Sequence, residues 1–392
     1  MEKIDELINR LAHTKIQTVP LWSVTAWDKK FNAVDKAMQK KIVRYKYLLA
    51  KDLEKLVVPN GTIRILYTTK DVAYTTEKLA SGYISEGEVV AIPWGGNPTV
   101  KYYNGKFVTG DNRIVTALDK TTLDNKYLFY WMDGETKTLA SFYRGAGIKH
   151  PSMVSVLTME IPLPPLAVQK EIVEILDTFT GMIDNLQKEL EQRQKQFEHY
   201  RDQLLTFKED ECKYSKLADV CEVINGRAYK QSELLSDGKY RVLRVGNFFS
   251  NDSWYYSNLE LDDKNYCQKG DLLYAWSASF GPRIWKEEKV VFHYHIWKMA
   301  CSDGLDRVFF YYWLQSHDME RQVSSGKHGA TMAHLTKKLM ESLMIPVPSL
   351  DKQQKIVDKL DTFEALISNI KQEIELRQKQ YEYYREKLLT FE

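Results

Sequence analysis

Residues 161–207 read IPLPPLAVQKEIVEILDTFTGMIDNLQKELEQRQKQFEHYRDQLLTF, and residues 345–391 read IPVPSLDKQQKIVDKLDTFEALISNIKQEIELRQKQYEYYREKLLTF. The two stretches align without a gap at an offset of 184 (345 minus 161), and 26 of the 47 aligned positions are identical. A match this dense is an internal repeat, and a repeat constrains the fold more strongly than any local motif. The chain therefore consists of two related halves.

Each copy of the repeat predicts one long helix. Both copies open with prolines, which favour an extended lead, and then run without proline through strong helix formers. Apolar residues recur in alternating steps of four and three over about five heptads, which is typical of a coiled coil. The predicted seam consists of Leu176, Ile183, Leu190, Arg193, Phe197 and Leu204 in the first helix, and of Leu360, Ile367, Ile374, Arg377, Tyr381 and Leu388 in the second.

The seam contains one polar residue in each copy, at equivalent positions. Arg193 and Arg377 are 184 residues apart, and a polar residue inside a seam can fix the register of two helices. Alternatively, each apolar stripe packs only on its own globular domain. That alternative explains the period but not the identical interruption, although a solvated end of the seam also accommodates an arginine.

The short connection between the halves favours antiparallel pairing. A helix over residues 169–207 spans roughly 58 Å, whereas a linker of about six residues after residue 207 reaches roughly 20 Å. Parallel helices would need the chain to run back most of the helix length. We therefore expect an antiparallel intramolecular coiled coil, with Leu176 close to Leu388 rather than to Leu360.

The regions before the two helices also resemble each other. Gly87-Glu88-Val89-Val90 matches Gly270-Asp271-Leu272-Leu273, and Tyr130-Trp131-Met132 matches Tyr312-Trp313-Leu314. Short β-rich runs, such as residues 63–67, 89–92 and 290–297, alternate with turn residues and short helical stretches at 126–132 and 306–315. The predicted fold class is α+β, with two similar globular domains joined by two long helices in a pseudo-two-fold arrangement.

The predicted boundaries follow from the repeat. Residues 1–160 form the first globular domain with a short N-terminal helix, and residues 161–207 form the first helical spacer. Residues 208–344 form the second domain, and residues 345–392 form the second spacer. A length of 392 residues at 44% hydrophobic and 28% charged composition is consistent with several packed units.

Composition excludes several classes of protein. The longest apolar runs fall far short of the roughly 20 residues that cross a bilayer, and residues 1–10 lack the apolar core of an export signal. We therefore expect a soluble, cytoplasmic protein. The four cysteines form no CxxC pair, so they indicate neither a disulfide framework nor a zinc ribbon.

No catalytic signature emerges from the sequence. No GxxxxGK[ST] phosphate loop, no GxGxxG after a strand and no nucleophile elbow is present. His293 and His295 would share one side of a strand and could hold a metal, but no third ligand has suitable spacing, so a structural or DNA-facing pair is the better interpretation. The sequence predicts no catalytic residue and no metal site.

Aromatic and basic residues alternate in loops of both halves, a composition that suits phosphate contacts, base stacking and hydrogen bonds to base edges. Taken singly, each could be a solvated lysine or a core aromatic, and only their pairing across the halves favours DNA binding. The candidate contacts are Lys41, Arg44, Lys46, Trp94, Asn97, Arg144, Lys149 and His150 in the first half, and Arg227, Tyr229, Lys230, Trp276, Ser277, Ser279, Arg283, Lys327 and His328 in the second.

The whole chain resembles the specificity subunit of a type I restriction-modification system. The most specific motifs are Ile161-Pro162-Leu163-Pro164-Pro165-Leu166 with its second copy at 345–348, and Lys216-Leu217-Ala218-Asp219-Val220 followed by Arg244-Val245-Gly246-Asn247. The start of the first half, Pro20-Leu21-Trp22-Ser23-Val24, departs from the second pattern. The placing of DNA contacts in that half is correspondingly less constrained.

The resemblance implies a division of labour. Each globular domain is then a target recognition domain that reads one half of a bipartite, asymmetric DNA target, and the helices fix the spacing and dock methyltransferase subunits, two copies in the family arrangement. A motor and nuclease subunit can join for cleavage. The chain itself would hold no cofactor, because S-adenosylmethionine and ATP are used by the partner subunits.

Two other classes of function remain as alternatives. A non-enzymatic coiled-coil scaffold with ligand-binding heads would share the architecture but would show no salt-sensitive affinity for DNA. A fused adenine methyltransferase would need an Asn-Pro-Pro-aromatic motif, and Asn97-Pro98-Thr99 is not one. The DNA target itself cannot be deduced from these residues.

The distribution of charge agrees with DNA binding. Residues 169–207 carry 5 basic and 8 acidic side chains and residues 353–391 carry 7 of each, so the helical stretches together hold −3. Residues 208–211 add −2 and Glu392 adds −1, so the remaining parts must carry +8 to give the net charge of +2. The near-neutral average therefore conceals basic globular domains, which attract phosphates.

Overall fold

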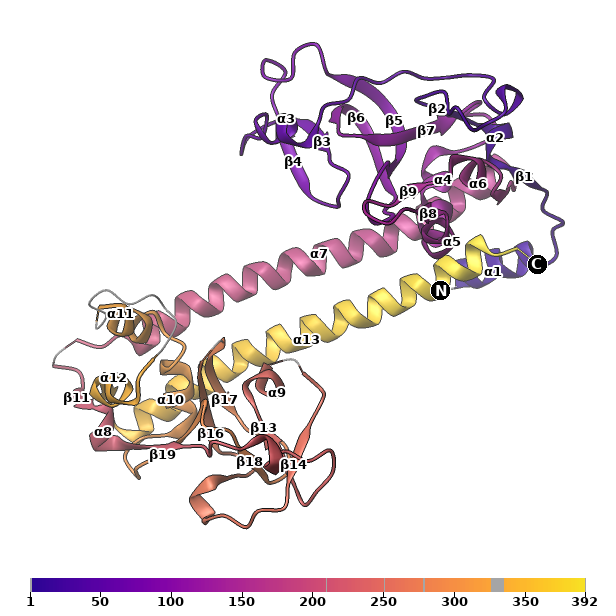
Figure 1. The fold of residues 1–392 in the computed structure, drawn as a ribbon. Coiled ribbons are helices and arrows are strands. Elements are labelled where there is room, and N and C mark those ends of the chain that lie inside the picture. The colour runs from indigo at the N-terminus through magenta and orange to yellow at the C-terminus, as the bar shows by residue number, and fades with distance from the viewer. Residues whose placement is uncertain (1, 209, 250, 278, 326–334, 392) are drawn as a thin grey trace. The chain divides into compact units, whose positions relative to one another are not determined.

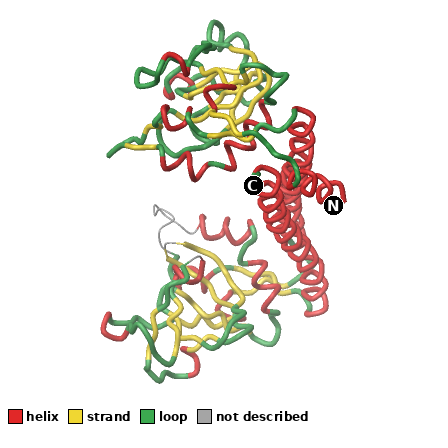
Figure 2. The backbone as a smooth tube through the Cα atoms, turned by 90° about the vertical axis from the view of Figure 1, so that its right-hand side faces the viewer, coloured by secondary structure: helices red, strands yellow, loops and turns green. Residues whose placement is uncertain are grey.

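The computed structural model describes residues 2–208, 210–249, 251–277, 279–325 and 335–391. The chain divides into two compact units. Unit 1 comprises Met1–Leu186 with Glu373–Glu392, and unit 2 comprises Gln187–Gln372. Figure 1 labels their elements, and Figure 2 distinguishes helices from strands.

Unit 1 is built around a six-stranded sheet with the order β2-β7-β5-β6-β3-β4. Neighbouring strands are antiparallel except for β3 and β6, which are parallel. The helices are α1 (Glu2–Ala12), α2 (Leu21–Val24), α3 (Ala50–Glu54), α4 (Asn125–Gly134), α5 (Thr136–Ser141), α6 (Met153–Leu157) and the start of α7 (Leu166–Leu205), with a 3₁₀ turn at Lys36–Met38. The sheet strands are β2 (Thr25–Trp27), β3 (Ile63–Leu66), β4 (Val72–Thr75), β5 (Ser85–Pro93), β6 (Lys101–Thr109) and β7 (Asn112–Ala117); β1 (Thr18–Pro20) pairs with β10 (Glu160–Pro162), and β8 (Tyr143–Arg144) with β9 (His150–Pro151).

Unit 2 contains two four-stranded sheets, with the orders β12-β19-β16-β17 and β14-β13-β18-β15. The strands are β11 (Lys213–Lys216), β12 (Cys221–Asn225), β13 (Tyr240–Leu243), β14 (Tyr255–Ser257), β15 (Tyr266–Cys267), β16 (Leu272–Ser277), β17 (Ser279–Ile284), β18 (Val290–Phe292), β19 (Ile296–Cys301) and β20 (Met344–Val347), and β11 pairs with β20. The helices are α8 (Leu217–Val220), α9 (Val245–Phe249), α10 (Arg307–Trp313), α11 (His317–Ser325), α12 (Lys337–Ser342) and most of α13 (Leu350–Leu389), with 3₁₀ turns at Gln231–Glu233 and Asp263–Asn265.

The two units share one topology at their centre. The order β2-β7-β5-β6 in unit 1 recurs as β12-β19-β16-β17 in unit 2, with antiparallel pairing throughout. Each order is preceded by a one-turn helix, α2 or α8, and by a strand that pairs with the proline-containing lead of a long helix. The divergent segment 20–24 therefore adopts the same structure as 216–220, and the predicted α+β repeat is confirmed.

The long helices pair antiparallel within each unit. In unit 1, Leu176 of α7 and Leu388 of α13 are buried in one core, and the rings of Phe179 and Tyr384 stack with centroids 5.4 Å apart. In unit 2, the rings of Tyr200 and Phe363 stack at the same distance. The start of each helix thus meets the end of the other, and the predicted antiparallel pairing is confirmed. Each helix extends over 40 residues, beginning slightly earlier than the sequence predicts.

All twelve predicted seam residues are buried or half-buried. The two arginines make equivalent contacts along their own helices: Arg193 donates to Gln196 and Glu189, and Arg377 donates to Gln380 and Glu373. Each guanidinium is therefore held by its own helix, through the residue three positions later and the residue four positions earlier. Whether they also fix the register stays a prediction.

A buried glutamine joins each long helix to the globular part of its unit. Gln353 is fully buried; its Nε2 donates to the carbonyl oxygens of Gly304 (2.9 Å) and Pro348 (2.8 Å), and its Oε1 accepts from the backbone N–H of Asp306 (2.7 Å). Asp306 in turn caps α10 by accepting from two backbone N–H groups. Gln169 makes the corresponding three hydrogen bonds in unit 1, to Thr122, Pro164 and Asp124, and Asp124 caps α4.

A tyrosine on each capped helix makes a second connection. The hydroxyl of Tyr130 in α4 donates to Asp177 of α7, and that of Tyr312 in α10 donates to Asp361 of α13, both at 2.6 Å. Burial and the carboxylate acceptor raise the pKa of both phenols. The same fastening therefore occurs once in each unit.

One predicted element differs from the structure. Residues 290–297 do not form a single strand, because β18 ends at Phe292 and β19 begins at Ile296. His293 and His295 lie in the intervening turn, where their ring centroids are 4.9 Å apart. The expectation that both project from one strand is therefore wrong. The two histidines instead lie in the turn that connects the two four-stranded sheets of unit 2.

Candidate nucleic-acid interface

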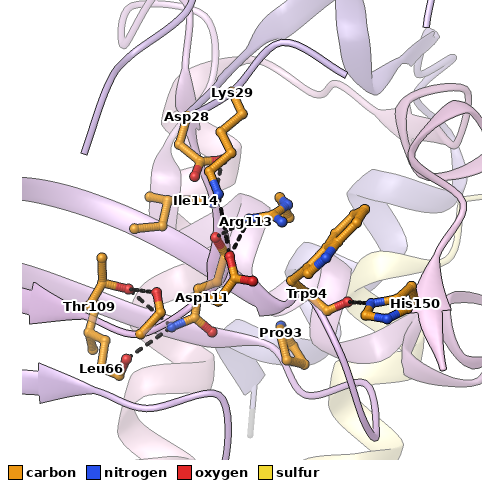
Figure 3. A network of polar contacts seen from close by, with 12 residues as sticks. Asp28, Lys29, Leu66, Pro93, Trp94, Thr109, Asp111, Arg113, Ile114 and His150 are labelled. Carbon is orange, nitrogen blue, oxygen red and sulfur yellow. Dashed lines mark hydrogen bonds and ion pairs between the residues drawn. The ribbon is translucent and has the colours of Figure 1, made fainter. Parts of the chain in front are cut away.

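In unit 1, Trp94 follows β5, and its indole ring has a guanidinium and an imidazole beside it (Figure 3). The guanidinium of Arg113 lies 4.0 Å from the ring centroid, and the imidazole of His150 lies 5.2 Å away. The Nδ1 of His150 donates to the carbonyl oxygen of Trp94 at 2.8 Å. Because a carbonyl oxygen can only accept, Nδ1 of His150 carries a proton in this bond, which orients the imidazole ring.

An ion-pair network holds Arg113 in place (Figure 3). Arg113 is 4% exposed and bonds Asp111 at 3.0 Å, and Asp111 also accepts from Lys29 at 3.3 Å. Lys29 lies over the ring of Tyr47 at 4.0 Å. The network therefore connects the segment that carries the predicted contacts Lys41, Arg44 and Lys46 to the tryptophan.

Beside this network, the carboxylate of Asp28 accepts a hydrogen bond from the backbone N–H of Ile114 at 3.1 Å (Figure 3). Burial raises the pKa of Asp28 to about 6, and the nearby cations Arg113 and Lys29 only partly offset that effect. Asp28 is therefore a buried acid whose charge changes near neutral pH.

Two loops meet next to Trp94. The backbone N–H of Gly96 donates to the carbonyl oxygen of Lys149 at 3.0 Å, which joins the 94–97 turn to the β8–β9 hairpin. A Cβ on Gly95 would come within 2.8 Å of the Ile148 side chain, so glycine permits this close approach without a shift of that side chain. The structure thus brings together five predicted contacts, and all except the half-buried tryptophan are exposed: Trp94, Asn97, Arg144, Lys149 and His150.

The other predicted contacts of unit 1 lie on an extended segment beside the sheet. The backbone N–H of Val43 donates to Trp27, and that of Leu48 donates to Thr109. Lys41 and Arg44 are exposed on this segment, whereas the ammonium of Lys46, also exposed, donates to the carbonyl oxygen of Gly82 at 2.8 Å.

In unit 2, Trp276 occupies the place that Trp94 has in unit 1, at the end of the equivalent strand. Its ring stacks on Trp297 with centroids 5.5 Å apart, and His295 approaches its edge at 5.2 Å. In the strand register, Tyr274 faces Trp297 as Ile92 faces Arg113. The tryptophan therefore recurs, but its stacking partner changes from a guanidinium to an indole.

Arg227 approaches Trp276 through the turn of residues 293–295. The backbone of Arg227 pairs with that of His293, and the indole N–H of Trp276 donates to the carbonyl oxygen of Tyr294 at 2.9 Å. Glu233 holds the guanidinium of Arg227 at 2.7 Å. Burial raises the pKa of the neighbouring Tyr229 to about 12.

The remaining predicted contacts of unit 2 are less closely grouped. Lys230 and Ser279 are exposed and Ser277 is half-buried. The guanidinium of Arg283 donates to the carbonyl oxygen of Phe248 in α9 at 2.5 Å, so the structure does not bring it to Trp276. Lys327 and His328 lie outside the described residues.

The structure contains a polar cavity beside Trp276 that the sequence did not predict. Its volume is about 550 Å³, and its lining includes Arg244, Asn247, Asn251, His293 and His295. Arg244 and Asn247 belong to a motif that carries the family resemblance, and that motif was the available signal. The cavity forms only when segments around residues 244–255 and 293–295 fold together.

Neither a metal site nor a membrane span emerges from the described residues. No group of three or more His, Cys, Asp and Glu side chains there is arranged to hold a metal ion. None of the helices in the same part of the chain is long and apolar enough to cross a membrane.

Comparisons with known proteins agree with one another. Residues 32–193 and 209–376 each match the family model of the type I restriction modification DNA specificity domain. The chain is 27% identical over 307 residues to the EcoR124I/EcoR124II specificity subunit of Escherichia coli, covering 71% of this chain and 74% of that protein. It is 29% identical over 340 residues to a putative type I specificity subunit of Haemophilus influenzae, covering 81% and 87%.

Solved structures show the same fold. The S subunit of a type I system from M. genitalium superposes with a TM-score of 0.61 at 16% identity, covering 96% of this chain and 97% of that one. A chain from a structure of type I restriction-modification complex assembly and conformational transition gives 0.52 at 15% identity, covering 86% and 96%.

Proposed function

Since the chain belongs to the family of type I restriction-modification DNA specificity subunits, we propose that each of its two recognition domains reads one half of a bipartite, asymmetric DNA target. The domains are residues 1–160 and 208–344, and the helical spacers are residues 161–207 and 345–392. As a member of this family, the chain is a DNA-recognition subunit and not an enzyme.

One observation carries the proposal. Trp94 and Trp276 stand at equivalent ends of equivalent strands, each beside polar groups that can hydrogen-bond base edges. A half-buried indole offers a flat apolar surface, and adjacent basic loops supply phosphate contacts. Two such surfaces with different polar neighbours suit a target whose halves differ in sequence.

The paired helices set the spacing between the half-sites. A helix of 40 residues is about 60 Å long and rigid enough to hold a fixed distance. Half-site separation in DNA-binding proteins generally follows the distance between the reading elements. The base pairs between the halves are then spanned without being read.

The same helices dock methyltransferase subunits, which family membership implies as partners together with DNA. Met182 and Leu366 are equivalent positions, 184 residues apart, and their side chains are 43% and 38% exposed. Equivalent apolar positions, one in each unit, suit two copies of one partner. The partners would use S-adenosylmethionine, and ATP where a motor and nuclease subunit joins. The complex would work in the cytoplasm.

Mapping of methylated adenine in cells with and without this gene tests the proposal. We expect one bipartite motif that disappears with the gene. Trp94→Ala should impair recognition of one half of that motif and Trp276→Ala the other half, because each tryptophan belongs to one domain. A coiled-coil scaffold that does not bind DNA would leave the methylation pattern unchanged, and that result would overturn the proposal.

A further inference from the structure

The polar cavity of unit 2 adjoins the surface around Trp276. It is lined by Ser236, Arg244, Val245, Gly246, Asn247, Asn251, Ser253, Trp254, Tyr255, His293 and His295. A volume of about 550 Å³ lies within the range of sites that bind small polar molecules. His295 belongs to the cavity and also contacts the edge of the Trp276 ring, so a DNA segment on the tryptophan would lie at the cavity mouth.

Arg244 differs from every other arginine of unit 2 in its contacts. The others each have a carboxylate or carbonyl acceptor: Arg193, Arg201, Arg227, Arg241, Arg283, Arg307 and Arg321. The guanidinium of Arg244 makes no hydrogen bond to another described residue and lies over the ring of Tyr255 at 5.1 Å. Arg244 is exposed, so its five N–H donors are accessible, and no described residue competes for them.

The rest of the cavity lining carries no lysine and no carboxylate. Among the described residues, no aspartate, glutamate or lysine lines it. Burial above all, and next the neighbouring His295 and Arg244, lower the pKa of His293 to about 4, so this imidazole is uncharged at neutral pH. The Nδ2 of Asn247 donates to the carbonyl oxygens of Asn251 and Ser253, at 2.9 and 2.8 Å, which fixes the far wall.

We propose that Arg244 reads a guanine in the half-site of unit 2, donating two hydrogen bonds to its O6 and N7 while the ring of Tyr255 lies beside the guanidinium. Paired donors from one arginine are the commonest specific contact to guanine. A cavity whose described lining holds one guanidinium and no lysine suits a base edge better than a phosphate, which usually collects several cations. The inference rests on the proposed function and names one residue that determines its specificity.

The experiment uses the complex of the full chain with its methyltransferase partner. Adenine methylation is measured on duplexes in which each base pair of the unit 2 half-site is changed in turn, for wild type, Arg244→Ala and Arg244→Lys. We expect discrimination at one G·C pair to fall about 10- to 100-fold in both variants, with the other positions unchanged. Arg244→Lys keeps the positive charge but loses the paired donors, so it separates geometry from charge.

Arg321→Ala is the matched control, because this exposed arginine has Asp318 on α11 as its one ion-pair partner among the described residues. It should leave the half-site unchanged. If Arg244→Ala instead weakens binding equally on all sequences and reduces the salt slope by about one, the residue contacts a phosphate and the inference is wrong. The inference is also wrong if the unit 2 half-site contains no G·C pair. It is equally wrong if the base preference at every position of that half-site is the same in both variants as in wild type. The proposed function would survive each of these results and would fail only if wild type showed no bipartite motif.

Discussion

The fastening of each long helix by one buried glutamine allows a sharp test. We predict that Gln353→Leu destabilises unit 2 by about 3 kcal/mol. Leucine has a similar volume but leaves one N–H and two carbonyl groups, at Asp306, Gly304 and Pro348, without their partner. An unsatisfied buried polar group costs about 1–3 kcal/mol. The lower end for all three groups gives the predicted value.

Hydrogen exchange monitored by mass spectrometry measures this effect locally. Peptides from α10 should lose protection by roughly two orders of magnitude in Gln353→Leu, because a free-energy change of about 1.4 kcal/mol corresponds to a factor of ten. The neighbouring Gln354 is exposed, and in the described part of the chain its side chain bonds Asp358 on the same helix and no other residue. Gln354→Leu should therefore cost less than about 0.5 kcal/mol.

The equivalent substitution in unit 1 extends the test. Gln169→Leu should release α4 as Gln353→Leu releases α10, because both glutamines make the same set of three hydrogen bonds. Equal protection of α10 in Gln353→Leu and Gln354→Leu would refute the assignment of the helix attachment to this side chain.

Three further predictions follow from other contacts. The raised pKa of Asp28, about 6, means that the folded state binds the proton more tightly than the unfolded state. The stability that this group contributes to unit 1 is therefore full below pH 4, and about 3 kcal/mol is lost as the pH rises through 6 to 7. Asp28→Asn should remove this loss, which denaturation at several pH values measures. A double-mutant cycle of Phe179→Ala and Tyr384→Ala should give about 1 kcal/mol of coupling, and no coupling would argue against the stacked antiparallel pair. Met182→Glu and Leu366→Glu should each weaken binding of one methyltransferase copy in calorimetric titration, while neither changes the stability of the chain by more than about 0.5 kcal/mol.

The sequence was sufficient for the architecture because the deciding information is periodic and repeated. The apolar spacing that predicts the paired helices extends over five heptads, and the short linker limits the chain to one orientation. The break between two strands in residues 290–297 was harder to predict from the sequence. Its apolar run continues on both sides of His293 and His295, and only the pairing of β18 and β19 in different sheets introduces the turn.

The candidate interface was predictable where its residues are close in sequence. The loops at 94–97 and 144–150 combine glycine with aromatic and basic side chains, and the structure brings them together. The motif that contains Arg244 pointed to one wall of the cavity, but the cavity itself was not predictable, because its walls come from segments nearly 50 residues apart. In the sequence, Arg283 and Arg244 are both arginines close to aromatic residues and cannot be told apart. In the structure, the guanidinium of Arg283 donates to the carbonyl oxygen of Phe248, whereas that of Arg244 makes no hydrogen bond to a described residue.

What the two units share, and what they do not, bears on the form of the DNA target. The glutamine ties, the aspartate caps and the tyrosine contacts recur in both units with matching partners. The groups that stack on the recurring tryptophan do not: Trp94 lies against Arg113 and His150, whereas Trp276 lies against Trp297 and the edge of His295. Base pairs are distinguished by their donors and acceptors. Two surfaces with one framework but different donors should therefore select different sequences, which makes a palindromic target incompatible with this chain acting as a single copy.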